Sequence, residues 1–163
     1  MNSSSQRSLP YPDTDGIIRN PSFLNEIASS RLYELGDISD YIYFSLLLKD
    51  CYPAVSELFE KLAMTEMRHF SLLGRMTLRL GGDPALRVRH SNPYYGSRSE
   101  CVDGQTVKRI LSAALEGEQL AVKRYMKLAN AMSADKAASA LLERIAADEE
   151  HHARMLSRAL GET

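Results

Sequence analysis

The chain of 163 residues contains no tryptophan and only two cysteines, Cys51 and Cys101. The cysteines stand fifty residues apart and form no C-x-x-C pair. This spacing excludes a zinc knuckle and a rubredoxin-type iron site. We therefore expect both side chains to be free thiols in a reducing cytoplasm.

The chain also lacks an excess of charge of either sign and any long apolar run. Lys and Arg number 20 against 21 Asp and Glu, for a net charge of −1, so no general attraction to nucleic acid or membrane surfaces is implied. No run approaches the roughly 18 apolar residues of a membrane span. The polar N-terminus has no apolar segment behind a basic start, so no secretory signal is evident and we expect a cytoplasmic protein.

Four long segments show the three- and four-residue apolar spacing of amphipathic helices. Pro53 is placed to start the second, Gly81 to end it, and Asp103 to cap the third. The predicted helices cover residues 22–49, 53–80, 105–132 and 136–160. Residues 1–20 are predicted to form an irregular leader, and residues 21–163 one helical domain.

The connections between these helices predict the topology. Short breaks join the first helix to the second and the third to the fourth, so each pair forms an antiparallel hairpin. The connection over residues 81–104 is much longer, and about 22 extended residues reach roughly 70 Å. That exceeds the length of the second helix, about 42 Å. We predict an all-α four-helix bundle with one long crossover, in which Tyr94 and Tyr95 pack on the bundle and His90 lies at the surface.

Both halves of the chain carry the same polar pattern on otherwise apolar helical faces: a Glu, a Tyr seven residues later, and a Glu-x-x-His motif. In the first half the residues are Glu34, Tyr41, Glu66 and His69. In the second half they are Glu118, Tyr125, Glu149 and His152. The first Glu precedes the motif by 32 residues in one half and by 31 in the other.

This repeat predicts a dinuclear metal site. Four glutamates at one level of a core would repel one another, and burying a carboxylate is costly unless a cation neutralises it. Residues i and i+3 share a helix face, so each Glu-x-x-His motif can bind one ion. Glu34 and Glu118 are then terminal ligands, and Glu66 and Glu149 bridge the two ions. Carboxylate and imidazole ligands suit iron, manganese and zinc.

Two tyrosines belong to the candidate site, and two neighbouring acidic residues are alternatives to be judged. Tyr41 and Tyr125, the candidate catalytic residues, are predicted to donate hydrogen bonds to metal-bound carboxylates as well as to fill the core. Glu116 is an alternative to Glu118, but only Glu118 repeats the spacing to tyrosine. Asp37, one turn after Glu34, is expected on a helix flank, with a place beside the ligands as the alternative.

The fourth helix offers a second register, Asp148-x-x-His151. The register of Glu149 and His152 fits the apolar stripe better and leaves His151 toward solvent.

These segments resemble the ferritin-like superfamily, and most closely its rubrerythrin and bacterioferritin branch. The matching stretches are ELGDISDYIYFS, TEMRHF, LEGEQLAVKRY and DEEHHARML, within residues 22–160. The resemblance implies a bundle with two iron or manganese ions per subunit. It also implies an oxidoreductase that reduces hydrogen peroxide or O2 in oxidative-stress defence, acts with an external electron donor, and forms a homodimer or higher homo-oligomer.

The chain departs from rubrerythrin in two respects. Rubrerythrin usually has a further Glu where this chain has Ala121, and it carries a rubredoxin domain that is absent here. Met67 stands where bacterioferritin has its haem-binding Met, but we expect hydrophobic packing and no haem. Three alternatives stay open: a bacterioferritin-type ferroxidase and iron store, a manganese-catalase relative, and a metal-free helical scaffold whose glutamates face water.

Overall fold

The computed structural model of the chain describes residues 10–86 and 102–162. A short 3-10 turn, η1 (Pro21–Phe23), precedes four long helices: α1 (Leu24–Leu48), α2 (Pro53–Leu80), α3 (Gly104–Ala131) and α4 (Lys136–Glu162). The predicted helices are confirmed, with ends displaced by at most two residues. No strand occurs within the described residues, so the all-α prediction is confirmed as well.

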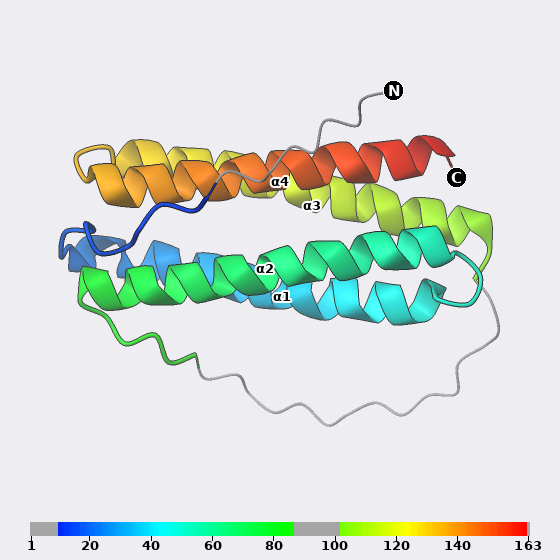
Figure 1. Cartoon of the computed structure of the whole chain (residues 1–163), viewed down its shortest axis with the longest axis horizontal. Coiled ribbons are helices and arrows are strands. Elements are labelled where there is room, and N and C mark those ends of the chain that lie inside the picture. The colour runs from blue at the N-terminus through cyan, green and yellow to red at the C-terminus, as the bar shows by residue number, and fades with distance from the viewer. Residues whose placement is uncertain (1–9, 87–101, 163) are drawn as a thin grey trace.

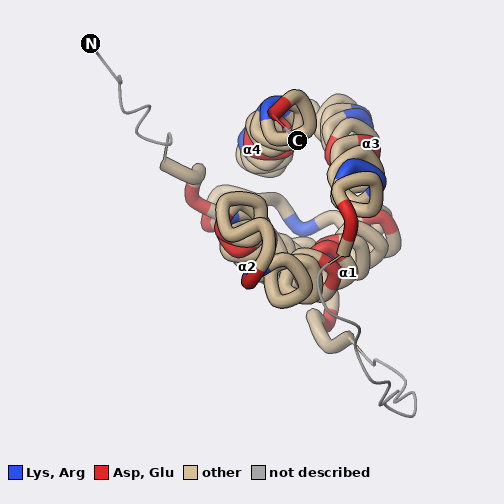
Figure 2. The backbone as a smooth tube through the Cα atoms, turned by 90° about the vertical axis from the view of Figure 1, so that its right-hand side faces the viewer, with Lys and Arg blue, Asp and Glu red and all other residues tan. Residues whose placement is uncertain are grey.

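The four helices form a bundle of two antiparallel hairpins, α1–α2 and α3–α4 (Figure 1). Helices α2 and α3 run in the same direction, so α2 ends and α3 begins at opposite ends of the bundle, as the predicted crossover requires. Figure 2, which looks along the bundle, shows α1 beside α3 and α2 beside α4. The predicted surface residues of the crossover, His90, Tyr94 and Tyr95, lie outside the described residues.

Local chemistry explains where the helices begin and end. Pro53 occupies the first turn of α2, where its missing N–H leaves no hydrogen bond unmade. Gly81 ends α2 with φ at 96°, a left-handed conformation that glycine adopts without strain. The Asp103 carboxylate accepts a hydrogen bond from the Thr106 amide at 2.7 Å and caps α3.

Two apolar clusters fill the core, one toward each end of the bundle. The first includes Ile27, Leu73, Met76, Leu128, Leu141 and Ile145. The second includes Leu48, Phe59, Leu62, Val107, Leu111 and Leu156. In every helix, the residues predicted as metal ligands fall between the stretches that belong to the two clusters. The candidate site is therefore enclosed by apolar layers on both sides.

The segment before the helices, residues 10–20, has no helix or strand and packs on the bundle. Thr14 and Ile17 are buried, and Ile17 joins the first apolar cluster. The Ile18 amide donates to Asp135, at the start of α4, at 2.7 Å. Figure 1 shows this segment in dark blue as it crosses α4 and the seam between α4 and α2.

Cys51, in the turn between α1 and α2, is disulfide-bonded. The expectation of a free thiol is therefore wrong for this residue. Spacing along the chain could not show the bond, because a disulfide depends on the distance between two residues in the fold. Cys101 lies outside the described residues. Among the described helices, none combines the length and the apolar character that crossing a lipid bilayer demands.

Candidate metal centre

The structure brings the six predicted ligands together in the middle of the bundle. Each is at most 4% exposed: Glu34 on α1, Glu66 and His69 on α2, Glu118 on α3, and Glu149 and His152 on α4. Helical spacing places each Glu-x-x-His pair on the inward face of its helix. The alternative of a metal-free scaffold required these glutamates to face water, and this burial contradicts it.

One group of ligands surrounds His69. Its Nδ1 atom lies 2.8 Å from Oε2 of Glu66 and 3.2 Å from Oε1 of Glu149. Oε2 of Glu34 lies 3.5 Å from the same nitrogen. We call these four residues the His69 sub-site. One donor atom from each lies within 4.8 Å of the other three, which is close enough for a single cation to contact them all.

A second group surrounds His152 in the same way. Its Nδ1 atom lies 2.9 Å from Oε1 of Glu66 and 3.1 Å from Oε2 of Glu149. Oε2 of Glu118 lies 3.5 Å away. These four residues, the His152 sub-site, also place their donor atoms within 4.8 Å of one another. Glu66 and Glu149 turn one oxygen toward each sub-site, which is the arrangement that bridging carboxylates require.

Several buried polar atoms in this cluster have no hydrogen-bond partner among the described residues. In the two sub-sites they are Glu34 Oε2, Glu66 Oε1, Glu149 Oε2 and His152 Nδ1. Native proteins rarely leave such atoms unsatisfied, because each costs free energy. Two divalent cations between these atoms would satisfy them all. The mixed carboxylate and imidazole set fits iron, manganese or zinc.

The clustered charges shift the pKa values of the ligands. Burial, reinforced by the charge on Glu149, raises the pKa of Glu66 to about 8. Burial alone would lower the pKa of His69 and of His152, but the surrounding carboxylates raise both well above the ordinary value. In the metal-free protein, protons thus neutralise the cluster. Metal binding should therefore release protons.

Tyr41 and Tyr125 hold the two terminal glutamates across the hairpins. The Tyr41 hydroxyl on α1 donates to Glu118 on α3, and the Tyr125 hydroxyl on α3 donates to Glu34 on α1. Burial raises the pKa of both hydroxyls well above the ordinary value, so both remain donors. The predicted hydrogen bonds to ligand carboxylates are present, and each joins a tyrosine to the glutamate of the other hairpin.

His69 has further partners that the sequence analysis missed. Its Nε2 atom lies 3.1 Å from Oδ2 of Asp148 and 3.4 Å from the Tyr11 hydroxyl. Arg144 donates to the other oxygen of Asp148. Burial alone would raise the pKa of Asp148, but hydrogen bonds from His69, Arg144 and Tyr11 lower it well below its usual range. Asp148 could have been found, because it directly precedes a ligand; no sequence signal places Tyr11 here.

The structure also places the other residues considered in the sequence analysis. Glu116 and His151 are exposed, whereas the residues preferred over them are buried. Asp37 is half-buried, and burial followed by the charges of Glu118 and Glu34 raises its pKa to about 7. These charges favour the alternative place of Asp37 beside the candidate ligands over the expected helix flank. Met67 is 46% exposed in the single chain, so its expected hydrophobic packing is not made within the bundle.

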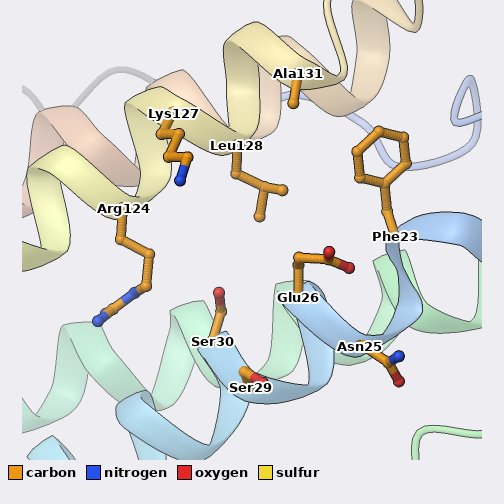
Figure 3. A pocket seen from close by; sticks show the side chains of 9 residues that line it. All are labelled: Phe23, Asn25, Glu26, Ser29, Ser30, Arg124, Lys127, Leu128 and Ala131. Atoms are coloured by element: carbon orange, nitrogen blue, oxygen red, sulfur yellow. The ribbon is translucent and has the colours of Figure 1, made fainter.

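A groove of about 620 Å³ lies between α1 and α3 toward one end of the bundle (Figure 3). Arg124, Lys127 and Leu128 of α3 line it on one side, and Glu26 and Ser30 of α1 on the other. None of the six ligands lines this groove. The buried centre and the groove are therefore separate features of the molecule.

Three solved structures share this fold. The bacterioferritin of Desulfovibrio desulfuricans is 21% identical with a TM-score of 0.70, over 86% of this chain and 78% of that chain. The bacterioferritin-related protein of Bacteroides fragilis, described as a dodecameric thioferritin, is 21% identical with a TM-score of 0.70, over 91% and 90%. A bacterioferritin of Mycobacterium tuberculosis is 24% identical with a TM-score of 0.71, over 89% and 87%. At these identities the similarity shows the fold alone.

Sequence comparison gives the family. None of the curated protein sequences compared with the chain is significantly similar to it. A family model described as a ferritin-like domain matches residues 41–163, which is well over half of the chain. This match covers the Glu-x-x-His motifs of both halves and agrees with the observed bundle. The chain belongs to the ferritin-like family.

Proposed function

We propose that this protein is an iron oxidoreductase of bacterioferritin type, a ferroxidase that oxidises Fe(II) at a dinuclear site with O2 or hydrogen peroxide. The observation that carries the proposal is the sharing of Glu66 and Glu149 between two sub-sites, each with unsatisfied buried atoms. Iron bound there would supply the electrons that reduce the oxidant. The chain supplies the ligands and a core that excludes water.

The chain's own residues prepare the centre for this chemistry. Tyr125 and Tyr41 orient the terminal glutamates, and the apolar clusters on both sides keep bulk water away. The raised pKa values of His69 and His152 mean that protons leave as cations enter. The described residues thus bind and orient the ions, and exchange them for protons.

The sequence favoured a rubrerythrin-like peroxidase, with a ferroxidase as the alternative. Two observations now support the alternative better. The position of the additional rubrerythrin glutamate is Ala121, a buried residue on α3 that offers no ligand atom. The three solved structures named above are two bacterioferritins and a bacterioferritin-related protein. The experiment below distinguishes this ferroxidase from an enzyme that reduces peroxide with an external electron donor.

We also infer that the protein is a homo-oligomer. Large apolar side chains are exposed on the hairpin α1–α2: Leu32, Tyr43, Leu46, Met64 and Met67. An interface between copies of the chain would cover these side chains. The related protein of Bacteroides fragilis is described as dodecameric. A shell of many copies would support iron storage, whereas a dimer would support turnover without storage.

The test is anaerobic loading with Fe(II) followed by O2 or hydrogen peroxide. Wild type should oxidise about two iron ions per chain far faster than buffer does. The Glu66→Ala protein should not, whereas Glu116→Ala, which changes an exposed glutamate, should match wild type. Oxidation at the buffer rate by wild type would contradict the proposal.

Three further measurements refine the assignment. Anomalous diffraction at the iron and manganese edges would identify the metal. The mass of the assembly, together with its iron content after repeated loading, would separate a storage shell from a small oligomer. Peroxide consumption that requires a reductant and leaves Fe(II) oxidation slow would instead support the peroxidase.

A further inference from the structure

We propose that Tyr11 is a positioning residue that acts through Asp148 on His69 and makes the His69 sub-site the tighter of the two cation sites. The proposal rests on the proposed dinuclear function and deepens it, because it assigns an order in which the ions are bound. It depends on residues 10–20, which precede the helices, and on the contact between Asp148 and His69, which has no counterpart at His152 among the described residues.

The Tyr11 ring is held from two helices of different hairpins. The guanidinium carbon of Arg68 on α2 and that of Arg144 on α4 each lie 4.5 Å from the ring centroid. Such cation–π contacts stabilise a ring most when it is shielded from water. The burial of Thr14 and Ile17 a few residues later keeps the segment on the bundle. The hydroxyl is therefore directed to one place at the seam of α2 and α4.

The Tyr11 hydroxyl lies beside Asp148 and Nε2 of His69, the ring nitrogen that is not among the candidate metal-binding atoms. It donates to Oδ2 of Asp148 at 2.5 Å, and the same oxygen lies 3.1 Å from Nε2 of His69. Arg144 donates to the other oxygen, so both oxygens of the carboxylate are held. An Asp148 carboxylate held in this way keeps the proton of His69 on Nε2. Nδ1 is then the nitrogen that would lose its proton and hold a cation.

The His152 sub-site lacks a matching arrangement. Asp148 directly precedes one bridging glutamate, and Thr65 directly precedes the other, Glu66. The Thr65 hydroxyl donates at 3.3 Å to the carbonyl of Lys61 on its own helix and not to a histidine. Within residues 10–86 and 102–162, no hydrogen bond holds Nε2 of His152. Among the described residues, the imidazole of His69 is therefore oriented from outside and that of His152 is not.

The test uses Co²⁺ titration of single sub-sites. Glu118→Ala should leave the His69 sub-site able to bind one ion, and Glu34→Ala should leave the His152 sub-site. Adding Tyr11→Phe should weaken Co²⁺ binding about 10- to 100-fold in the Glu118→Ala protein, the usual loss when the support of a ligand is removed. In the Glu34→Ala protein it should change binding by less than about twofold. Phenylalanine keeps the ring between the two arginines and removes only the hydroxyl.

Controls separate the possible failures. Tyr33→Phe removes the hydroxyl of another tyrosine under an arginine, Arg124, and should leave both sub-sites unchanged. Wild type is titrated first, and failure to bind two Co²⁺ ions would contradict the proposed function itself. If wild type binds two ions but Tyr11→Phe weakens both sub-sites equally, or neither, the positioning role is overturned while the dinuclear site stands.

Discussion

The glutamate oxygens around Nδ1 of His69 lie at 2.8, 3.2 and 3.5 Å, and those around Nδ1 of His152 lie at 2.9, 3.1 and 3.5 Å. The surroundings of these near-copies differ. His69 is backed by Asp148 and Tyr11, whereas Asp37 on α1 is influenced by the charges of Glu118, Glu34 and Glu149. The repeated sequence pattern thus reproduces the candidate ligands and their tyrosine donors but not the support of His69, so the two sub-sites should bind cations unequally.

The largest effects should come from the ligands that the two sub-sites share. Removing Glu66 or Glu149 takes a donor from both ions, so either alanine variant should retain fewer than about one ion per chain. Removing Glu34 or Glu118 affects one sub-site, and about one ion should remain. Metal analysis after dialysis measures this difference. A Glu66→Ala protein that keeps two ions would show that the shared position is wrongly assigned.

The tyrosines should give a smaller, side-specific effect. Tyr125→Phe leaves Glu34 without its donor, and Tyr41→Phe does the same to Glu118. Each change should lower the free energy of unfolding by on the order of 1–2 kcal/mol and loosen the ion on its own side only. Denaturant unfolding and Co²⁺ titration report the two effects, with Tyr43→Phe, on an exposed ring, as the control. If either change weakened Co²⁺ binding equally in both sub-sites, the pairing of each tyrosine with a single glutamate would be contradicted.

An effect confined to higher pH should come from Asp37, whose counterpart three residues after Glu118 is Ala121. The folded pKa of about 7 lies above the usual value of about 4. Between these pH values the folded metal-free protein holds a proton that the unfolded chain has lost, so this group lowers stability as pH rises. Asp37→Asn should match wild type near pH 4 and exceed it by roughly 1–2 kcal/mol at pH 8.

Unfolding of the metal-free protein across this pH range measures the difference. Asp40→Asn, on an exposed position of the same helix, is the control. A constant gap between Asp37→Asn and wild type at all pH values would show that Asp37 is not perturbed by the ligand cluster.

Much of the fold and of the ligand set could be predicted because it depends on spacing within single helices. The apolar periodicity located α1 to α4, and local turn chemistry located Gly81 and Asp103 at helix ends. The i, i+3 spacing brought Glu66 and His69 to one face. The division into a leader of residues 1–20 and a domain of residues 21–163 stays a prediction, as does the cytoplasmic location.

Other features could not be predicted because they join segments that are distant in the sequence, and the local spacing of residues does not show how such segments pack together. The disulfide at Cys51 and the placement of Tyr11 between Arg68 and Arg144 are of this kind. So is the exchange of tyrosine hydrogen bonds between hairpins, in which Tyr41 holds Glu118. The periodicity of a helix shows which residues face inward, but not which side chain of another helix each one meets.

The amino-acid sequence by itself determined four amphipathic helices and the inward positions of six ligands, because helical geometry repeats every few residues and burial of apolar faces then closes the bundle. Only the tertiary structure decided that two glutamates are shared, that each tyrosine serves the opposite hairpin, and that one histidine is backed by a residue from the leader. These contacts depend on how rigid helices and a non-helical segment dock, and docking depends on surfaces from distant parts of the chain.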